Sequence, residues 1–160
     1  MTSPESKGNC CGWLKNCLSW FDARGRSLFI DIGLLAIRLF YGPAMAFGHG
    51  LAKLQTFDDE KDGFLALWPF NSATSLALAI FAEFCCSLAL LVGFATRISA
   101  FFLAFTMGVA AFVFHAEDPF ATKEKALLYL TVYIALILMG PGRFSIDGLI
   151  HCKIREWWKE

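Results

Sequence analysis

The feature that most constrains this chain is a series of four long apolar stretches that carry almost no charge. They run from about Leu28 to Ala52, Ala73 to Ala95, Ile98 to His115 and Glu124 to Gly140. A helix needs roughly 17–25 predominantly apolar residues to cross the hydrocarbon layer of a membrane. The pattern therefore predicts an all-α membrane protein, built as an antiparallel bundle of four transmembrane helices.

The composition agrees with this interpretation. Hydrophobic residues make up 57% of the 160 residues and charged residues only 18%, whereas soluble domains run near 45–50% and about 25%. The 14 basic and 14 acidic residues cancel, so nothing in the charge indicates a nucleic-acid partner. The residues before Leu28 lack an early apolar stretch, so we expect no secretory signal peptide. We therefore expect the lipid bilayer to surround the apolar stretches of this chain.

The connections between the spans differ in length. The short segment Gly93–Arg97 predicts a tight hairpin between spans two and three, and Pro119 interrupts the link between spans three and four. Spans one and two are separated by residues 53–72, whose acidic run we interpret as a solvated surface. The predicted organisation is an N-terminal segment (1–27), a transmembrane domain (28–142) and a C-terminal segment (143–160).

Both terminal segments predict amphipathic helices that lie in the membrane interface. Apolar residues recur at helical spacing in each segment. They are Trp13, Leu14, Cys17, Leu18 and Phe21 before the first span, and Ile150, Ile154, Trp157 and Trp158 after the last. Ser145 is the expected N-cap of the C-terminal helix, and Gly140-Pro141-Gly142 is expected to end the fourth span.

Basic residues near the span ends predict the orientation. With four spans, the two termini and the second loop share one side of the membrane. That side carries Lys7, Lys15, Arg24, Arg26, Arg97, Arg143, Lys153, Arg155 and Lys159, against Lys53, Lys61, Lys123 and Lys125 on the other. We therefore expect a multi-pass protein of the cell (inner) membrane with both termini in the cytoplasm.

Two charged residues lie deep inside predicted spans, where charge is expensive and usually marks a site. Arg38 is about 15 Å and Glu83 about 18 Å from the cytoplasmic ends of their spans, at about 1.5 Å per residue. Because either charge alone would be uncompensated, the sequence predicts an Arg38–Glu83 ion pair near the centre of the bilayer.

Further polar residues share helical faces with this pair. Asp31, Arg38, Gly42, Met45 and His49 fall on one face of span one, and Lys53 is close by; Glu83, Cys86 and Ser87 follow in span two, and Tyr129 and Tyr133 in span four. These residues either hydrogen-bond the helices to one another or line a polar cavity for a redox molecule or a lipid headgroup. The sequence leaves both interpretations open.

Histidines and cysteines add little that is specific. His49 and His115 lie near carboxylates at the outer ends of spans, where interfacial hydrogen bonding is a commoner role than metal binding. Adjacent Cys85 and Cys86 point about 100° apart on a helix, which suits neither a disulfide nor a shared metal. The thiols of the tails (Cys10, Cys11, Cys17 and Cys152) lack a C-x-x-C spacing, and a reducing cytosol argues against disulfides there. No metal site is predicted.

No nucleotide-binding or hydrolase motif is present, but several segments together resemble the DoxX family. They are Arg38-Leu39-Phe40-Tyr41-Gly42, the run from Phe47 to Leu54, Glu83 followed by Leu90 to Arg97, His115, Glu124 and Tyr129, and Gly140 to Asp147. The resemblance covers about Ile30 to Leu149. It marks Arg38, His49, Lys53, Glu83, His115 and Asp147 as the positions expected to matter, whereas the cysteine-rich segment from Cys10 to Trp20 departs from the family pattern.

The resemblance implies a small four-helix membrane protein, in a family named after a subunit of a thiosulfate:quinone oxidoreductase. Our first hypothesis is therefore a membrane subunit of a redox system that interacts with a quinone or a sulfur compound, quinone being the cofactor it would use. The polar site would comprise Arg38, Glu83, His49, Lys53, His115, Cys86, Tyr129 and Tyr133. The rival is a non-catalytic accessory or assembly subunit of a larger membrane complex, and the resemblance does not decide whether the protein is an enzyme. A permease is less favoured, since four short helices leave little room for alternating access.

Overall fold

A computed structural model describes residues 28–157, and every regular element within that range is a helix. The helices are α2 (Leu28–Met45), α3 (Leu51–Gln55), α4 (Phe57–Glu60), α5 (Ser72–Ile80), α6 (Ser87–Val92), α7 (Thr96–Val109), α8 (Phe120–Met139) and α9 (Ile146–Trp157). Three π-helical segments lie between or after them: η2 (Ala46–Gly50), η3 (Phe81–Cys86) and η4 (Ala110–Phe114). The predicted helix at Trp13–Phe21 lies outside the described residues.

These elements join into longer continuous helices. Three of them are long and apolar enough to cross a membrane: Leu28–Gln55, Ser72–Val92 and Thr96–Phe114. They match the first three predicted spans within a few residues. The fourth predicted span corresponds to α8, a helix of 20 residues that begins after Pro119 and carries Lys123, Glu124 and Lys125 near its start. Whether α8 also crosses the bilayer stays a prediction.

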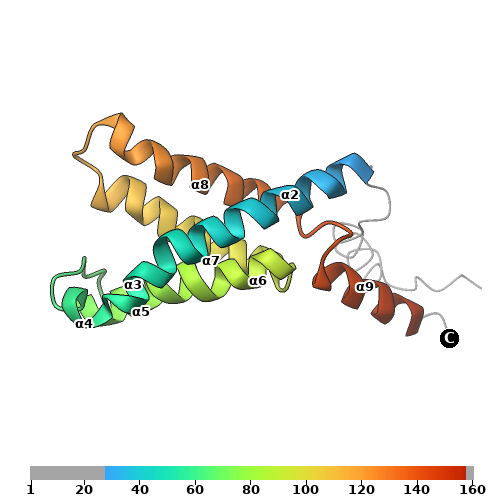
Figure 1. Cartoon of the computed structure of the whole chain (residues 1–160), viewed down its shortest axis with the longest axis horizontal. Coiled ribbons are helices and arrows are strands. Elements are labelled where there is room, and N and C mark those ends of the chain that lie inside the picture. The colour runs from blue at the N-terminus through green and yellow to red at the C-terminus, as the bar shows by residue number, and fades with distance from the viewer. Residues whose placement is uncertain (1–27, 158–160) are drawn as a thin grey trace, which may run out of the picture.

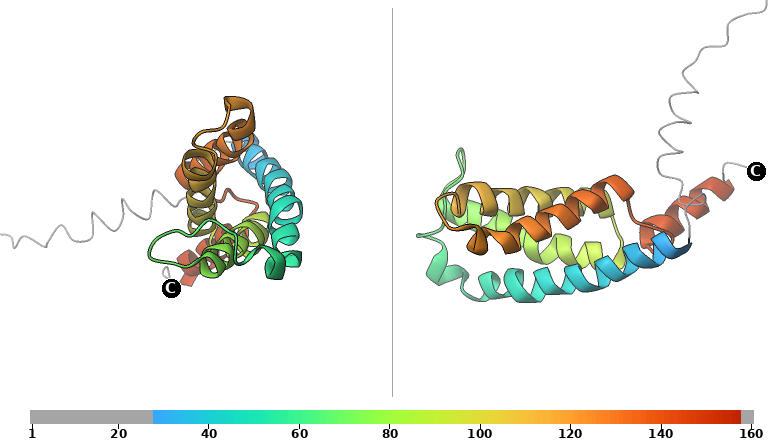
Figure 2. Two further views of the ribbon diagram at one scale, coloured as in Figure 1. Left: turned by 90° about the vertical axis from the view of Figure 1, so that its left-hand side faces the viewer. Right: turned by 90° about the horizontal axis from the view of Figure 1, so that it is seen from above.

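The long helices lie side by side as an elongated bundle (Figures 1 and 2). The start of α2 and the whole of α9 lie at one end of the bundle, called here the α9 end. The α4 loop, residues 56–71, and the connection between α7 and α8 lie at the opposite end, called here the loop end. The views agree that α7 and α8 run next to each other in opposite directions, as the short connection predicts.

Two glycines bring the first and second spans into close contact. A Cβ atom on Gly50 would lie 2.7 Å from the backbone carbonyl carbon of Glu83, and one on Gly42 would lie 3.1 Å from the carbonyl oxygen of Ser87. Small residues allow such close approach of helices in membranes. The contacts fix the antiparallel register of these two helices: Gly50 lies beside Glu83, and Gly42 beside Ser87 and Leu91.

The interior and the surface of the bundle are both apolar. The buried core cluster is made of Leu34, Met45, Cys86, Leu90, Ala100, Leu103, Ala104, Met107, Tyr133 and Leu136. Large apolar side chains are also exposed along the outer faces of the long helices, among them Phe29, Phe40, Phe101, Phe112 and Leu138. A soluble monomer rarely exposes so extensive an apolar surface, whereas lipid contact accounts for it.

The turns follow the sequence signals. Gly93 (φ 73°) ends α6 and Ala95 (φ 44°) precedes α7, which confirms the predicted hairpin. Gly140 and Gly142, both with positive φ, follow the end of α8. The Ser145 hydroxyl accepts a hydrogen bond of 3.0 Å from the backbone N–H of Gly148, which confirms Ser145 as the N-cap of α9. The position of α9 at a membrane surface remains a prediction.

Candidate ligand-binding site

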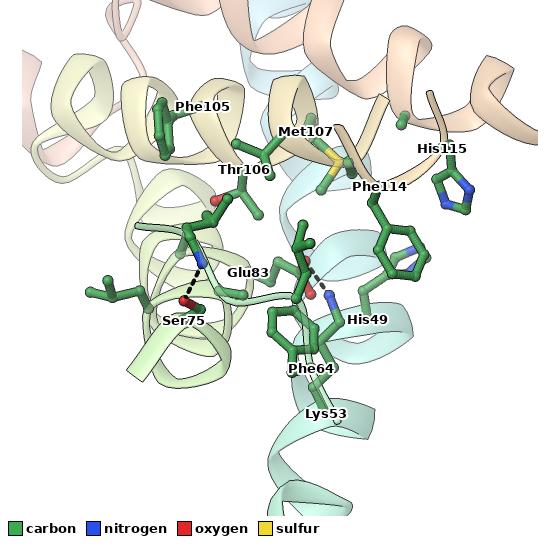
Figure 3. A pocket seen from close by; sticks show the side chains of 18 of the residues that line it. His49, Lys53, Phe64, Ser75, Glu83, Phe105, Thr106, Met107, Phe114 and His115 are labelled. Carbon is green, nitrogen blue, oxygen red and sulfur yellow. Dashed lines mark hydrogen bonds and ion pairs between the residues drawn. The ribbon is translucent and has the colours of Figure 1, made fainter. Parts of the chain in front are cut away.

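A cavity of about 1290 Å³ lies inside the loop end of the bundle. Figure 3 shows its wall, to which α7, the π-helical segments and the α4 loop contribute side chains. Most of the lining is apolar and aromatic, including Phe64, Phe81, Phe102, Phe105 and Phe114. A few polar groups interrupt this lining, chiefly His49, Lys53, Glu83, His115 and Tyr129. An apolar cleft with few placed polar groups is the usual form of a small-molecule site.

An ion pair forms the most polar part of the cavity wall. Lys53 Nζ lies 2.5 Å from Glu83 Oε1, and the Glu83 side chain is only 2% exposed whereas that of Lys53 is 28% exposed. The second carboxylate oxygen, Oε2, is buried and has no hydrogen-bond partner among the described residues. The Phe64 ring, from the α4 loop, lies 6.0 Å from Lys53 Nζ, within range of a cation–π interaction. One acceptor of a buried carboxylate is thus left for another group.

The predicted Arg38–Glu83 ion pair is wrong. In the observed register Gly50, not Arg38, lies beside Glu83, and these two positions of the first span are about three helical turns apart. The prediction counted depth from the ends of the apolar stretches and so aligned those ends. The ends are not aligned, because the start of α2 extends past the end of α6 and the hairpin that follows it (Figure 1). Hydropathy gave the helices but not their relative shift.

Two aromatic contacts position His49 and Tyr129 on the cavity wall. Their ring centroids are 6.0 Å apart in an edge-to-face arrangement, and Tyr41 meets Tyr129 in the same way at 5.4 Å. Tyr133, one turn further along α8, is fully buried in the core, with its ring 6.0 Å from that of Tyr129. The structure therefore brings His49, Tyr129 and Glu83 to one cavity, and holds Tyr133 in the core beside it.

His115 lies at the rim of the same cavity, at the end of the third span. Its Nδ1 atom is 2.6 Å from Asp118 Oδ2, and its ring stacks edge-on against Phe114. Figure 3 shows His115 on the far side of Phe114 from the Lys53–Glu83 pair. Within residues 28–157 no group of three or more His, Cys, Asp or Glu side chains is arranged to hold a metal ion.

The other predicted site residues lie elsewhere. Cys86 is buried in the core cluster, while its neighbour Cys85 is exposed, so the two side chains point apart as predicted. Arg38 is fully buried at the α9 end and donates a hydrogen bond from Nη2 to the backbone carbonyl of Phe144. Neither residue lines the cavity. The eight predicted site residues therefore divide among three places: five line the cavity, Cys86 and Tyr133 lie in the core, and Arg38 lies at the α9 end.

The polar residues of the α9 end form a separate cluster, which fastens the C-terminal segment to the bundle. The Asp147 carboxylate accepts hydrogen bonds of 2.8 Å from the backbone N–H groups of Ala95 and Thr96, and the Asp147 N–H donates to the Gly93 carbonyl at 2.9 Å. Asp31 accepts from the Arg143 N–H at 3.1 Å. This cluster satisfies backbone groups that the hairpin and the segment after α8 leave outside regular helices.

Sequence reasoning missed the feature that these spans share. Each candidate span contains a π-helical segment, and all three segments contribute to the cavity: His49 from η2, Glu83 from η3 and Phe114 from η4. A π-helical turn is usually a single-turn insertion and is frequent at functional sites. No composition or spacing signal in the three segments marks them in advance.

The fold and the site together define a small, multi-pass helical membrane protein with an internal cavity. The DoxX family model matches residues 33–116. The inner membrane protein YqjF of Escherichia coli (strain K12) is 32% identical over 129 residues, which cover 77% of this chain and 95% of YqjF. No solved structure matches. The chain belongs to the DoxX family.

Proposed function

We propose that this DoxX protein is a membrane subunit that binds a quinone in the loop-end cavity, with α8 as a fourth transmembrane helix. The observation that carries the proposal is a buried carboxylate, Glu83, with one oxygen held by Lys53 and the other unpartnered among the described residues, inside a mainly aromatic cavity. A ring with polar oxygens suits such a place, because its faces contact aromatic side chains and its oxygens meet the few polar groups.

The polar groups fit the chemistry of a quinone head. Lys53 and His49 offer N–H donors to a quinone carbonyl oxygen, and the free Glu83 oxygen accepts a hydrogen bond from a quinol hydroxyl. When bound, a quinone takes up two electrons and two protons. The residues of this chain would exchange the protons, and a partner protein of a redox complex would supply the electrons. The mainly apolar lining favours a quinone over a small sulfur oxyanion.

The proposal includes an orientation. With four crossings and cytoplasmic termini, the loop end and its cavity face the outer side of the membrane. Reporter fusions at Glu160 and within the Asp58–Asp62 segment test this arrangement. We expect the first reporter in the cytoplasm and the second outside, and both reporters on one side would refute the four-crossing topology.

Quinone titration of the purified protein in lipid nanodiscs tests the binding. We expect saturable binding, seen by quinone absorbance and by mass spectrometry of the extracted ligand. The same titration with the reduced ligand tests Glu83, because only the quinol has hydroxyl groups that donate to its free oxygen. Glu83→Gln removes this charged acceptor, which is worth about 1.5–3 kcal/mol, so the Kd for the quinol is expected to rise about 10-fold or more. Glu124→Gln is the matched control, because this carboxylate is exposed and lies outside the cavity.

An absence of quinone binding by the native protein would overturn this function. The rival interpretation, a non-catalytic accessory subunit, would then be favoured, and capture of a stable membrane complex through a tagged chain would be its test. Equal quinol affinity in the native protein and in Glu83→Gln would remove Glu83 from the binding site while leaving the cavity in place.

A further inference from the structure

The cavity is bounded by two different kinds of surface. At the loop end the α4 loop covers it, with Asp59 and Glu60 at the edge and Phe64 over Lys53. The loop is fastened to α5, because the backbone N–H of Leu67 donates a hydrogen bond of 3.0 Å to the Ser75 hydroxyl. Figure 3 shows this bond beneath the α7 side of the cavity. The end of the cavity toward the aqueous side is therefore acidic, and a fastened loop lies across it.

The cavity also reaches the side of the bundle, between the second and third spans. Leu78 and Phe81 from the second span and Phe102 and Phe105 from the third all line it. The same four residues are between 41% and 60% exposed. Lining residues nearer the loop end are exposed as well, among them Asp59, Trp68 and Lys125, but these four are apolar and lie together between the two spans. We call these four residues the lateral opening.

The lateral opening lies within the membrane-crossing part of the helices. Leu78 and Phe81 are one turn apart inside Ser72–Val92, and Phe102 and Phe105 are one turn apart inside Thr96–Phe114. The Phe81 and Phe102 rings meet edge to face across it at 6.1 Å. Phe81 is only two residues from Glu83, so the opening and the ion pair are at similar depth. All four side chains are apolar, and none would hold water or a charged ligand.

We propose that the ligand enters the cavity sideways from the hydrocarbon layer through the lateral opening, and that its class is a membrane-dissolved amphiphile with a long apolar tail. The tail lies between the second and third spans, against Leu78 and Phe105, while the polar head reaches the Lys53–Glu83 pair. This inference rests on the proposed quinone binding and adds the ligand's route and its tail. It follows from an apolar, exposed opening on one side and a fastened, acidic cover on the other.

The experiment compares two quinones in nanodiscs: a long-tailed isoprenoid quinone already in the lipid, and a short, water-soluble quinone without a tail. The double variant Leu78→Trp/Phe105→Trp narrows the lateral opening. The control Leu138→Trp/Phe112→Trp makes the same two changes at exposed apolar positions that do not line the cavity. We expect the narrowed variant to bind the long-tailed quinone at least about tenfold more slowly or more weakly, and the control to match the native protein.

The short quinone separates failure of this inference from failure of the proposed function. Binding of the short quinone within twofold of the native affinity shows that the narrowed variant is folded and its polar site intact. Unchanged binding of both quinones in the narrowed variant would overturn lateral entry and leave quinone binding standing. Failure of the native protein to bind either quinone would overturn both. Phe81→Ala provides a second arm: widening the opening should speed exchange of the long-tailed quinone, and unchanged exchange would contradict the proposal.

Discussion

The two ends of the bundle use buried polar residues in opposite ways. At the α9 end, Asp147 and Ser145 have both found backbone partners, and Arg38 donates to a backbone carbonyl. At the loop end, Glu83 pairs with another side chain, Lys53, and faces a large cavity. Arg38 and Ser145 are as deeply buried as Glu83, so burial alone does not distinguish a structural group from the group that we propose binds a ligand. What distinguishes them is the partner of each side chain: backbone groups at the α9 end, and another side chain beside a cavity at the loop end.

The backbone explains this difference. At the α9 end the chain leaves regular helix twice, at Gly93–Ala95 and after Met139, and the N–H and C=O groups freed there need partners away from water. Side chains supply them. At the loop end the second span passes through η3 without leaving helical structure, so its backbone N–H and C=O groups need few hydrogen bonds from side chains. Glu83 can then offer hydrogen-bonding capacity to a ligand.

The largest expected effect is at the α9 end. Asp147→Ala removes two charge-assisted hydrogen bonds and leaves the N–H groups of Ala95 and Thr96 unpaired. We expect a loss of about 2–4 kcal/mol in unfolding free energy, measured by denaturant unfolding in detergent. Asp58→Ala, at an exposed carboxylate of the α4 loop, is the control. A stability equal to that of the native protein would show that the cluster does not hold the C-terminal segment.

The next effect compares two glycines of η2, one packed against the second span and one not. A Cβ at Gly50 would lie 2.7 Å from the backbone of Glu83, whereas one at Gly48 would meet nothing within 4 Å. Gly50→Ala should therefore push the first two spans apart and cost about 1–3 kcal/mol, together with weaker ligand binding. Gly48→Ala should be neutral or slightly stabilising. Thermal unfolding of both variants measures the difference, and equal stabilities would refute the close packing of these helices at the cavity.

A third, smaller effect tests which basic residue forms the ion pair with Glu83. A double-mutant cycle on Lys53→Met and Glu83→Gln should give a coupling of about 1–2 kcal/mol, reduced because Lys53 is partly exposed. The same cycle on Arg38→Met and Glu83→Gln should be additive within about 0.5 kcal/mol, since these residues are several turns apart. Stronger coupling of Glu83 to Arg38 than to Lys53 would contradict the observed register of the first two spans.

How much of this was visible in the sequence depends on the kind of signal. Hydropathy predicted the helices, and Gly93, Pro119, Gly140 and Ser145 predicted the turns and the α9 cap, because these signals are local. The polar face of the first span was also predicted, and Asp31, Arg38, Gly42 and Met45 are buried. The pairing of Glu83 was not, because it depends on the shift between two helices. That shift is set by the close contacts at Gly42 and Gly50, which hydropathy does not register.

The smallest expected effect is at the surface of the loop end. The hydrogen bond from Lys61, at 2.8 Å, lowers the pKa of Asp58 below its ordinary value of 3.8. A lowered carboxyl pKa contributes stability above the unfolded pKa, and this contribution disappears as the pH falls through the folded pKa. Because Asp58 is exposed and Lys61 is partly exposed, solvent screens the pair, and Lys61→Met should leave the unfolding temperature unchanged at neutral pH. A measurable drop would assign this pair a structural role in the cover of the cavity.

The bonds of Asp147 also have a consequence for the order of events during synthesis. The ribosome releases the α6–α7 hairpin some fifty residues before Asp147, at a rate of about 5–20 residues per second. For those seconds the N–H groups of Ala95 and Thr96 lack the Asp147 carboxylate that accepts from them in the folded protein. The hairpin can reach its final form only when the segment after α8 returns to it. Truncation before Asp147 should thus leave a chain whose spans are inserted in the membrane but whose α6–α7 hairpin lacks its C-terminal contacts. Such a chain is expected to be degraded by quality-control proteases.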